Sequence, residues 1–135
     1  MHRYFNVDRT DEAIIAQIVD AHLNGAALAD FIKQELLEML DEDQPKTLII
    51  DFQNVKSVSS SMISSFLQIS NRMRSSDARL VFCAMSESLR SIFKTLKLDG
   101  SVFLIVDSVE EALDSKQRSY FDASGKYSPP DDELA

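Results

Sequence analysis

The sequence predicts a single α/β domain in which about four helices pack on a mixed five-stranded sheet. The chain has 135 residues, a length that suits one domain with one core. Short apolar runs alternate with longer segments whose apolar residues recur at helical spacing. Such alternation is typical of parallel strands joined by right-handed crossovers. We expect this domain to span residues 1–118, with a flexible acidic tail over residues 119–135.

Five apolar runs are predicted to be strands. The first two are separated only by a polar turn, so we expect them to pair antiparallel. Each later run follows a helical segment and should be a buried parallel strand. The predicted strands span residues 3–7, 13–19, 47–52, 79–84 and 102–106.

The predicted helices are recognised by apolar residues at helical spacing. These residues should face the sheet, while the polar residues between them face solvent. The expected apolar faces are Leu28, Phe31, Ile32, Leu36, Met39 and Leu40 in the first helix, Met62, Ile63, Phe66, Leu67, Ile69 and Met73 in the second, Leu89, Ile92, Phe93 and Leu96 in the third, and Val109, Ala112 and Leu113 in the fourth.

Residues at the ends of these segments predict where the helices begin and end. The acidic run at 41–43, followed by Pro45, is expected to end the first helix and form a solvated loop. Ser86 should cap the third helix. Ser108 and Glu111 have capping-box spacing at the start of the fourth.

The charge balance narrows the classes of partner. Fourteen Lys and Arg residues against 22 Asp and Glu residues give a formal net charge of −8. Such a field repels phosphate backbones and anionic lipid headgroups, so we expect no direct binding to nucleic acid or membranes. No signal-peptide pattern and no apolar stretch of about 20 residues is visible, which makes the cytoplasm the expected compartment.

Few residues are suited to catalysis or to holding a cofactor. The three glycines are far apart, which argues against a glycine-rich phosphate loop. Two histidines and one cysteine show no metal-ligand spacing, and His22 is expected to be a surface residue. Cys83 is expected to be a buried hydrophobe. Asp51 ends a strand, but no acidic pair suitable for an aspartyl-phosphate site accompanies it. We therefore expect no metal, no cofactor and no enzyme activity.

The most informative local feature is a serine cluster between a buried strand and an amphipathic helix. The segment at 57–62 reads SVSSSM. One serine explains a helix N-cap, because its hydroxyl accepts a backbone N–H, but three in a row exceed that need. The alternatives are a capped tight turn and a phosphorylation site, since a phosphate at a helix N-terminus meets exposed N–H groups.

Residues 47–113 resemble STAS domains, the family of anti-sigma-factor antagonists. In that family a buried strand ending in Asp-hydrophobe leads to a serine-containing loop, then to helix, strand, helix, strand and a final E-E-A-L-type helix. The matching pieces here are Asp51 with Phe52, Val55 to Val58, Ser59 to Met62, Leu80 to Ala84, Leu89 to Leu98, Phe103 to Val106, and Glu110 to Leu113.

The resemblance implies a function in bacterial signal transduction and transcription regulation. Such domains bind an anti-sigma factor with serine kinase activity, a GHKL-type ATPase, and phosphorylation of the loop serine releases the complex until a phosphatase resets it. By position that serine is Ser60, with Ser59 and Ser61 as alternatives. The sequence has Ser59 where the family usually has an acidic residue, and Met62 where it usually has glycine.

Three hypotheses follow for the function. The first is the phospho-regulated antagonist, whose partner-binding surface we expect at the loop and the exposed side of the second helix. The second is a non-phosphorylated STAS scaffold or protein-interaction module. The third is a ligand binder or minor enzyme that uses a pocket under the serine loop. The partner-binding residues expected for the first are Ser59, Ser61, Met62, Ser64, Ser65 and Gln68.

Overall fold

The computed structural model describes residues 3–11, 13–100 and 102–114. Within these ranges a five-stranded sheet has the order β1-β2-β4-β6-β7, with β1 antiparallel to β2 and the other neighbours parallel. The strands are β1 (Phe5–Arg9), β2 (Ala13–Ile18), β4 (Thr47–Asp51), β6 (Arg79–Cys83) and β7 (Leu104–Val106). The predicted α/β class, the mixed five-stranded sheet and the antiparallel first strand are confirmed.

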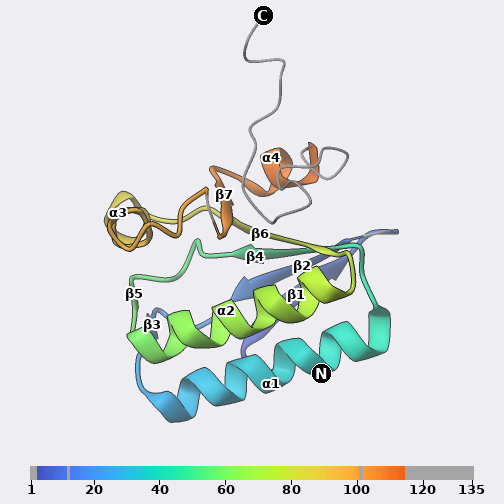
Figure 1. Cartoon of the computed structure of the whole chain (residues 1–135), viewed down its shortest axis with the longest axis horizontal. Coiled ribbons are helices and arrows are strands. Elements are labelled where there is room, and N and C mark those ends of the chain that lie inside the picture. The colour runs from blue at the N-terminus through green and yellow to red at the C-terminus, as the bar shows by residue number, and fades with distance from the viewer. Residues whose placement is uncertain (1–2, 12, 101, 115–135) are drawn as a thin grey trace, which may run out of the picture.

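Four helices complete the described domain, as predicted. They are α1 (Ala26–Asp43), α2 (Ser60–Ser75), α3 (Glu87–Thr95) and α4 (Val109–Asp114). Figure 1 shows α1 and α2 side by side on one face of the sheet and α4 on the opposite face. The predicted tail at 119–135 and the predicted domain boundary at 118 lie outside the described residues.

The end of α1 differs from the prediction. Residues 41–43, expected to form a loop, are the last residues of the helix. The residue after the helix, Gln44, caps it with a φ of 45°, and its N–H donates to the Leu40 carbonyl oxygen 3.0 Å away. Two of the acidic side chains are held by cations, because Asp43 pairs with Arg9 at 2.8 Å and Asp41 pairs with Arg72.

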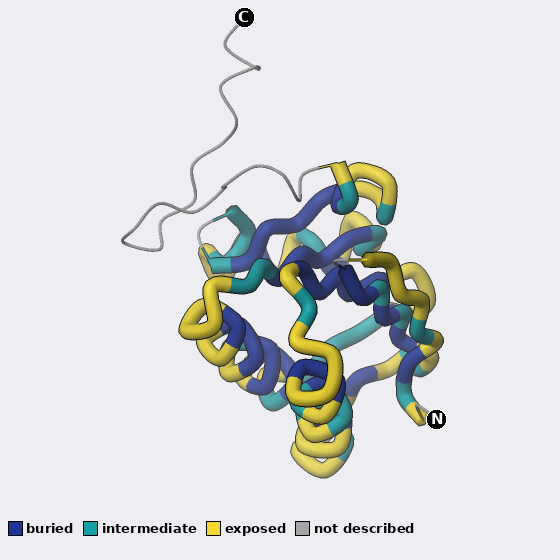
Figure 2. Tube along the Cα trace, turned by 90° about the vertical axis from the view of Figure 1, so that its right-hand side faces the viewer, coloured by how far each residue is buried: buried dark blue, intermediate teal, exposed yellow. Residues whose placement is uncertain are grey.

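The larger core lies between the sheet and α1 and α2. Its centre is the Phe82 ring, which contacts four other rings at centroid distances of 4.6 to 6.1 Å: Phe52, Phe66, Phe93 and Phe103. A smaller apolar cluster lies under α4 on the other face, around Ile49, Val81 and Cys83. Figure 2 shows the buried residues as a dark-blue layer, with the outer turns of the helices in yellow.

Three residues that were predicted to face the core are exposed. Phe31 on α1 is 56% exposed, and Ile92 and Leu96 on α3 are 42% and 52% exposed. Leu89 and Phe93 are the buried residues of α3, so its apolar face is wider than the part the sheet covers.

A second, two-stranded sheet was not predicted. Strand β3 (His22–Leu23) pairs in parallel with β5 (Ser57–Val58), and α1 and α2 follow these strands after two residues and one residue respectively. Because the two strands are parallel neighbours, both helices begin at the same edge of the molecule (Figure 1). Two-residue strands are too short to show a periodic pattern in the sequence.

Candidate functional site

The serine cluster lies at the edge of the sheet where the parallel strands end. The chain leaves β4 at Asp51, whose carboxylate accepts a hydrogen bond from the Gln53 N–H at 2.8 Å and another from the Gln17 side-chain amide at 3.4 Å. Asp51 is only 7% exposed. Its carboxylate therefore stabilises the turn that leads into the serine loop.

The loop is held against the connection between β2 and α1. The N–H groups of Lys56 and Ser57 both donate to the Ala21 carbonyl oxygen, at 2.6 and 3.2 Å. The Ser59 N–H donates to the Leu23 carbonyl oxygen at 2.9 Å. The loop is therefore fixed by backbone hydrogen bonds before α2 begins.

His22 adds a side-chain contact that the sequence reasoning missed. Its Nδ1 atom lies 2.8 Å from the Ser57 hydroxyl oxygen. His22 was expected to be an ordinary surface residue, and it is indeed exposed. A sequence signal for this contact is lacking, since His22 and Ser57 are 35 positions apart.

The three consecutive serines have different surroundings. Ser59 is the N-cap of α2, and its hydroxyl accepts a hydrogen bond from the Met62 N–H at 3.4 Å. Ser61 is half-buried. Ser60 is the first residue of the helix and is exposed. Of the three candidate phospho-acceptors, Ser60 is therefore the most accessible.

Two of the expected partner-binding residues lie at the surface of α2. Ser64 and Gln68 are exposed. The Gln68 side-chain oxygen accepts a hydrogen bond from the Lys33 ammonium of α1 at 3.1 Å. The accessible face of α2 near the serine loop is thus formed by Ser60, Ser64 and Gln68, with Ser59 and Ser61 half-buried beside it.

Two other expected contact residues are buried, and the prediction that they face a partner is wrong. Met62 has no exposed surface and belongs to the main core, and Ser65 is only 6% exposed. Ser65 lies three and seven positions before Gln68 and Arg72, which both bond to α1. It is therefore on the side of α2 against which α1 packs.

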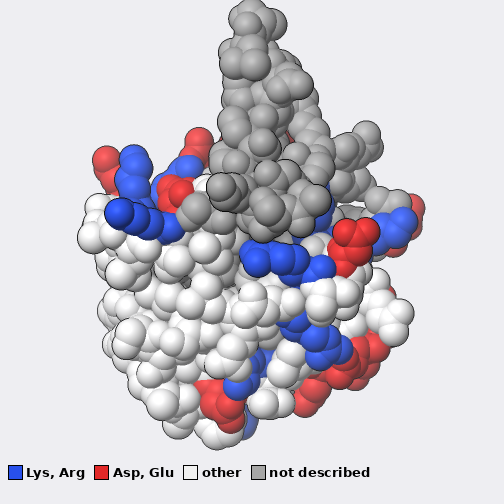
Figure 3. All heavy atoms as spheres, in the orientation of Figure 1, with Lys and Arg blue, Asp and Glu red and all other residues white. Residues whose placement is uncertain are grey.

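The start of α2 carries no acidic side chain that would repel an added anion. The first turns of both α1 and α2 contain no acidic residue. The surface over the beginning of α2 and over β5 shows no charged side chains in Figure 3. A charge added at Ser60 would therefore change the character of this part of the surface.

Cys83 lies at the end of β6, beside the strand that carries Asp51. It is fully buried and its partner in the register is Asp51. Burial raises the pKa of the Cys83 thiol from 9.0 to about 12, and the negative charge of Asp51 acts in the same direction. The thiol therefore stays protonated and unreactive near neutral pH, in agreement with its expected role as a buried hydrophobe.

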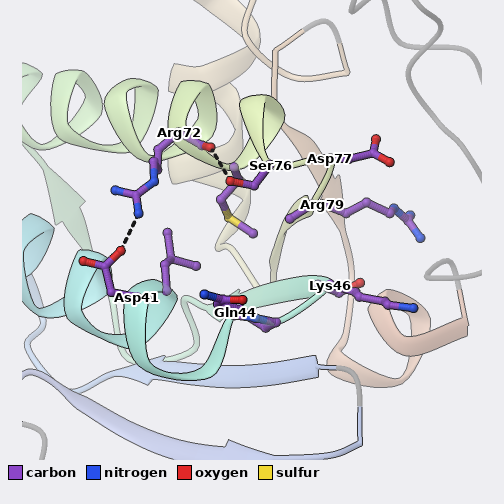
Figure 4. A pocket seen from close by; sticks show the side chains of 12 residues that line it. Asp41, Gln44, Lys46, Arg72, Ser76, Asp77 and Arg79 are labelled. Atoms are coloured by element: carbon purple, nitrogen blue, oxygen red, sulfur yellow. Dashed lines mark hydrogen bonds and ion pairs between the residues drawn. The ribbon is translucent and has the colours of Figure 1, made fainter.

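A cavity of about 680 Å³ lies at the opposite edge of the sheet, where α1 and α2 end. Figure 4 shows Arg72 and Asp41 paired on one side of it, and Lys46 and Arg79 extending together on the other. Its lining comes from the ends of α1 and α2 and the starts of β4 and β6. This cavity is far from the serine loop, so it does not support the hypothesis of a ligand site under that loop.

None of the helices in the described ranges combines the length and the apolar character that crossing a bilayer requires. Among those same residues, no three His, Cys, Asp or Glu side chains are grouped so that they could hold a metal ion.

The fold is shared with solved structures of low sequence identity. A Thermotoga maritima protein described as a candidate anti-sigma factor antagonist, TM1081, matches with a TM-score of 0.74 at 17% identity, covering 84% of this chain and 95% of that one. The unphosphorylated anti-sigma factor antagonist SpoIIAA matches with a TM-score of 0.68 at 19% identity, covering 84% and 96%. A STAS domain protein from Planctomyces limnophilus gives 0.72 at 17% identity, covering 83% and 96%.

Comparison with curated protein sequences finds no match. The family model for the STAS domain matches residues 5–112, which include every strand that the structure describes and the first part of α4, up to Ala112. With this match and the shared fold, the chain belongs to the STAS domain family and is structurally similar to anti-sigma factor antagonists.

Proposed function

We propose that this protein is an anti-sigma-factor antagonist that binds an anti-sigma factor with serine kinase activity and is released by phosphorylation of Ser60. The partner is a GHKL-type ATPase, and a phosphatase resets the switch in the cytoplasm. The protein itself acts by binding and catalyses no reaction. The observation that carries the proposal is the exposure of Ser60 at the first position of α2, next to a capping serine.

The surroundings of Ser60 support a phosphorylation switch. A phosphate there lies near the positive end of the α2 dipole, and the start of α1 is at the same edge. No acidic residue in either first turn repels it. The modification adds about 1.5 to 2 negative charges to a surface without charged groups in Figure 3, which disfavours a partner that fits the neutral form.

Similar structures provide a second line of support. SpoIIAA has been solved in both an unphosphorylated and a phosphorylated form, and both share the fold of this chain. The phosphorylated form matches with a TM-score of 0.61 at 19% identity. The fold thus exists in a protein that carries a phosphate.

The non-phosphorylated interaction module is the second candidate. It is favoured by the capping role of Ser59, whose hydroxyl bonds the Met62 N–H, because a cap alone explains one serine of the cluster. In this alternative the exposed face formed by Ser60, Ser64 and Gln68 binds its partner constantly.

The experiment that separates these functions is a pull-down from the native host with three variants. The unmodified protein and Ser60→Ala are expected to retain a GHKL-type kinase, and Ser60→Asp is expected to lose it. Ser75→Asp places the same charge at the far end of α2, where the side chain is also exposed, and should retain the kinase. Equal retention by Ser60→Asp and the unmodified protein refutes the switch and favours the constant module.

A further inference from the structure

An apolar patch made of Tyr4, Val19 and Phe31 lies outside the serine site. The Tyr4 and Phe31 rings are stacked, with centroids 6.4 Å apart and planes 4° apart. The Val19 N–H donates to the Tyr4 carbonyl oxygen at 3.0 Å, which places Val19 beside this pair. Phe31 is 56% exposed and Val19 is 46% exposed. Large exposed side chains that gather in this way are typical of protein-binding surfaces.

Tyr4 is held on α1 by a carboxylate. The two oxygens of Glu35 accept hydrogen bonds from the Arg3 and Tyr4 N–H groups, at 2.7 and 2.9 Å. The backbone at Tyr4 is therefore fixed against the helix that carries Phe31. A preorganised aromatic pair loses little conformational freedom when a partner covers it.

The outer face of α1 continues from the patch as an acidic stripe. Ala27, Phe31, Gln34, Glu38 and Glu42 follow one another at spacings of three or four residues, so they share one side of the helix, and all five are exposed. From Phe31 to Glu42 the stripe is about 16 Å long. It contains an apolar part at its start and carboxylates at its end, and no Lys or Arg lies on it.

We propose that the apolar patch and the acidic stripe of α1 together bind a basic polypeptide segment that carries an aliphatic or aromatic anchor. The anchor covers Phe31 and Tyr4, and cationic side chains of the segment pair with Glu38 and Glu42. Apolar anchors at helical spacing are the usual feature of a bound amphipathic helix, and complementary charges beside the apolar contact set the choice of partner between two packed helices. This surface is separate from Ser60, and the proposal does not depend on the phosphorylation switch.

Charge also argues against a second copy of the chain as the occupant. Two copies would bring carboxylates of the same stripe together, in a protein of formal net charge −8. Helix α3 offers an internal comparison, because Ile92 and Leu96 are exposed to a similar extent but Lys94 and Lys97 lie nearby in the sequence. A basic segment should prefer the acidic stripe to α3.

The proposal is tested by nuclear magnetic resonance titration of the isotope-labelled full chain with three synthetic helical peptides of about 15 residues. The first has Lys and Leu at amphipathic spacing, the second has Glu in place of Lys, and the third has Ser in place of Leu. The first is expected to shift the amide signals of Tyr4, Val19, Phe31 and Glu38. Phe31→Ser should weaken its binding about tenfold, and the matched variant Ile92→Ser should change it less than about twofold.

Three outcomes overturn the proposal. Equal affinity for the first and third peptides would show that the apolar anchor does not contribute and that the acidic protein attracts any basic peptide. Shifts confined to α3 or the serine loop, with affinity unchanged in Phe31→Ser, place the site elsewhere. A dimer in sedimentation that Phe31→Ser dissociates shows that a second copy covers the patch. Because the Phe31 ring is exposed, Phe31→Ser should retain the dispersed spectrum of the folded chain.

Discussion

The Nδ1 atom of His22 lies 2.8 Å from the hydroxyl oxygen of Ser57, across the short parallel pairing of β3 with β5. This contact joins the segment that precedes α1 to the segment that precedes α2. The start of α2, with Ser60, is therefore positioned by a part of the chain about 35 residues earlier, as well as by the strand before it.

We predict that removing this contact loosens the loop and leaves the core intact. A hydrogen bond of this kind contributes about 0.5–1.5 kcal/mol, and solvent exposure places this one at the lower end. His22→Ala and Ser57→Ala should show a coupling of about 0.5 kcal/mol in a double-mutant cycle of urea unfolding. Hydrogen exchange at the Ser59 N–H should accelerate in both single variants. Additive single and double variants would contradict the contact.

The cap of α2 yields a prediction about the consecutive serines. Ser59→Ala should lower the free energy of unfolding by about 0.5–1 kcal/mol, because it removes the hydroxyl acceptor of the Met62 N–H, while the Ser59 carbonyl oxygen at 3.1 Å still accepts from the same group. Ser60→Ala should change it by less than about 0.5 kcal/mol, since the side chain is exposed. Ser86→Ala is the matched control, because Ser86 caps α3 and accepts from the Leu89 N–H at 3.1 Å. A larger cost for Ser60→Ala than for Ser59→Ala would reverse the assigned roles.

The aromatic core makes the third prediction. Phe82→Ala should lower the free energy of unfolding by about 3–5 kcal/mol. The Phe82 ring contacts Phe52, Phe66, Phe93 and Phe103, so its removal leaves a cavity among these four rings. Phe82→Leu fills part of that space and should lower the free energy of unfolding by less. This variant can therefore still be measured if Phe82→Ala does not fold. Phe31→Ala, on the exposed patch, should have a free energy of unfolding within about 0.5 kcal/mol of that of the unmodified chain. Similar costs at positions 31 and 82, in guanidinium unfolding, would refute this core.

The raised pKa of Cys83 leads us to predict that the folded chain loses stability as the pH becomes alkaline. Its folded pKa of about 12 lies above the ordinary 9.0, mainly because of burial and then because of Asp51. The unfolded chain therefore loses the thiol proton first, so the thiol's contribution is complete below pH 9.0 and is lost as pH rises towards 12. By linkage, the stability that the thiol loses over this pH range is roughly 4 kcal/mol at most. Cys83→Ala should show a shallower loss of stability than the unmodified chain between pH 9 and 11, and parallel curves would contradict the shift.

The sequence predicted the main sheet and the helices because their patterns are long and regular. The buried face of α2, with Met73 at its end, follows from one amphipathic segment. Ser65 could not be placed in the same way. Its burial comes from α1, a separate segment whose Lys33 and Asp41 bond to Gln68 and Arg72 of α2.

The residues 41–43 and the helix α3 illustrate two other limits of the sequence reasoning. The acidic run is helical, and within it Asp43 and Asp41 pair with Arg9 and Arg72, which are distant in sequence and so gave no local signal. Ile92 and Leu96 fit the helical period of α3 but extend beyond the surface that the sheet covers. Periodicity indicates which residues share a face, and the tertiary structure decides how much of that face is buried.

The measurement that tests the central claim most directly is phosphate mapping on the protein purified from its native host. Trypsin cleaves after Lys56 and Arg72 and releases residues 57–72 as one peptide that contains all three candidate serines. Fragmentation of this peptide by mass spectrometry should place the phosphate on Ser60, and the peptide from Ser60→Ala should carry none. A phosphate on Ser59 or Ser61, or no phosphate in this peptide in either growing or starved cells, would contradict the account.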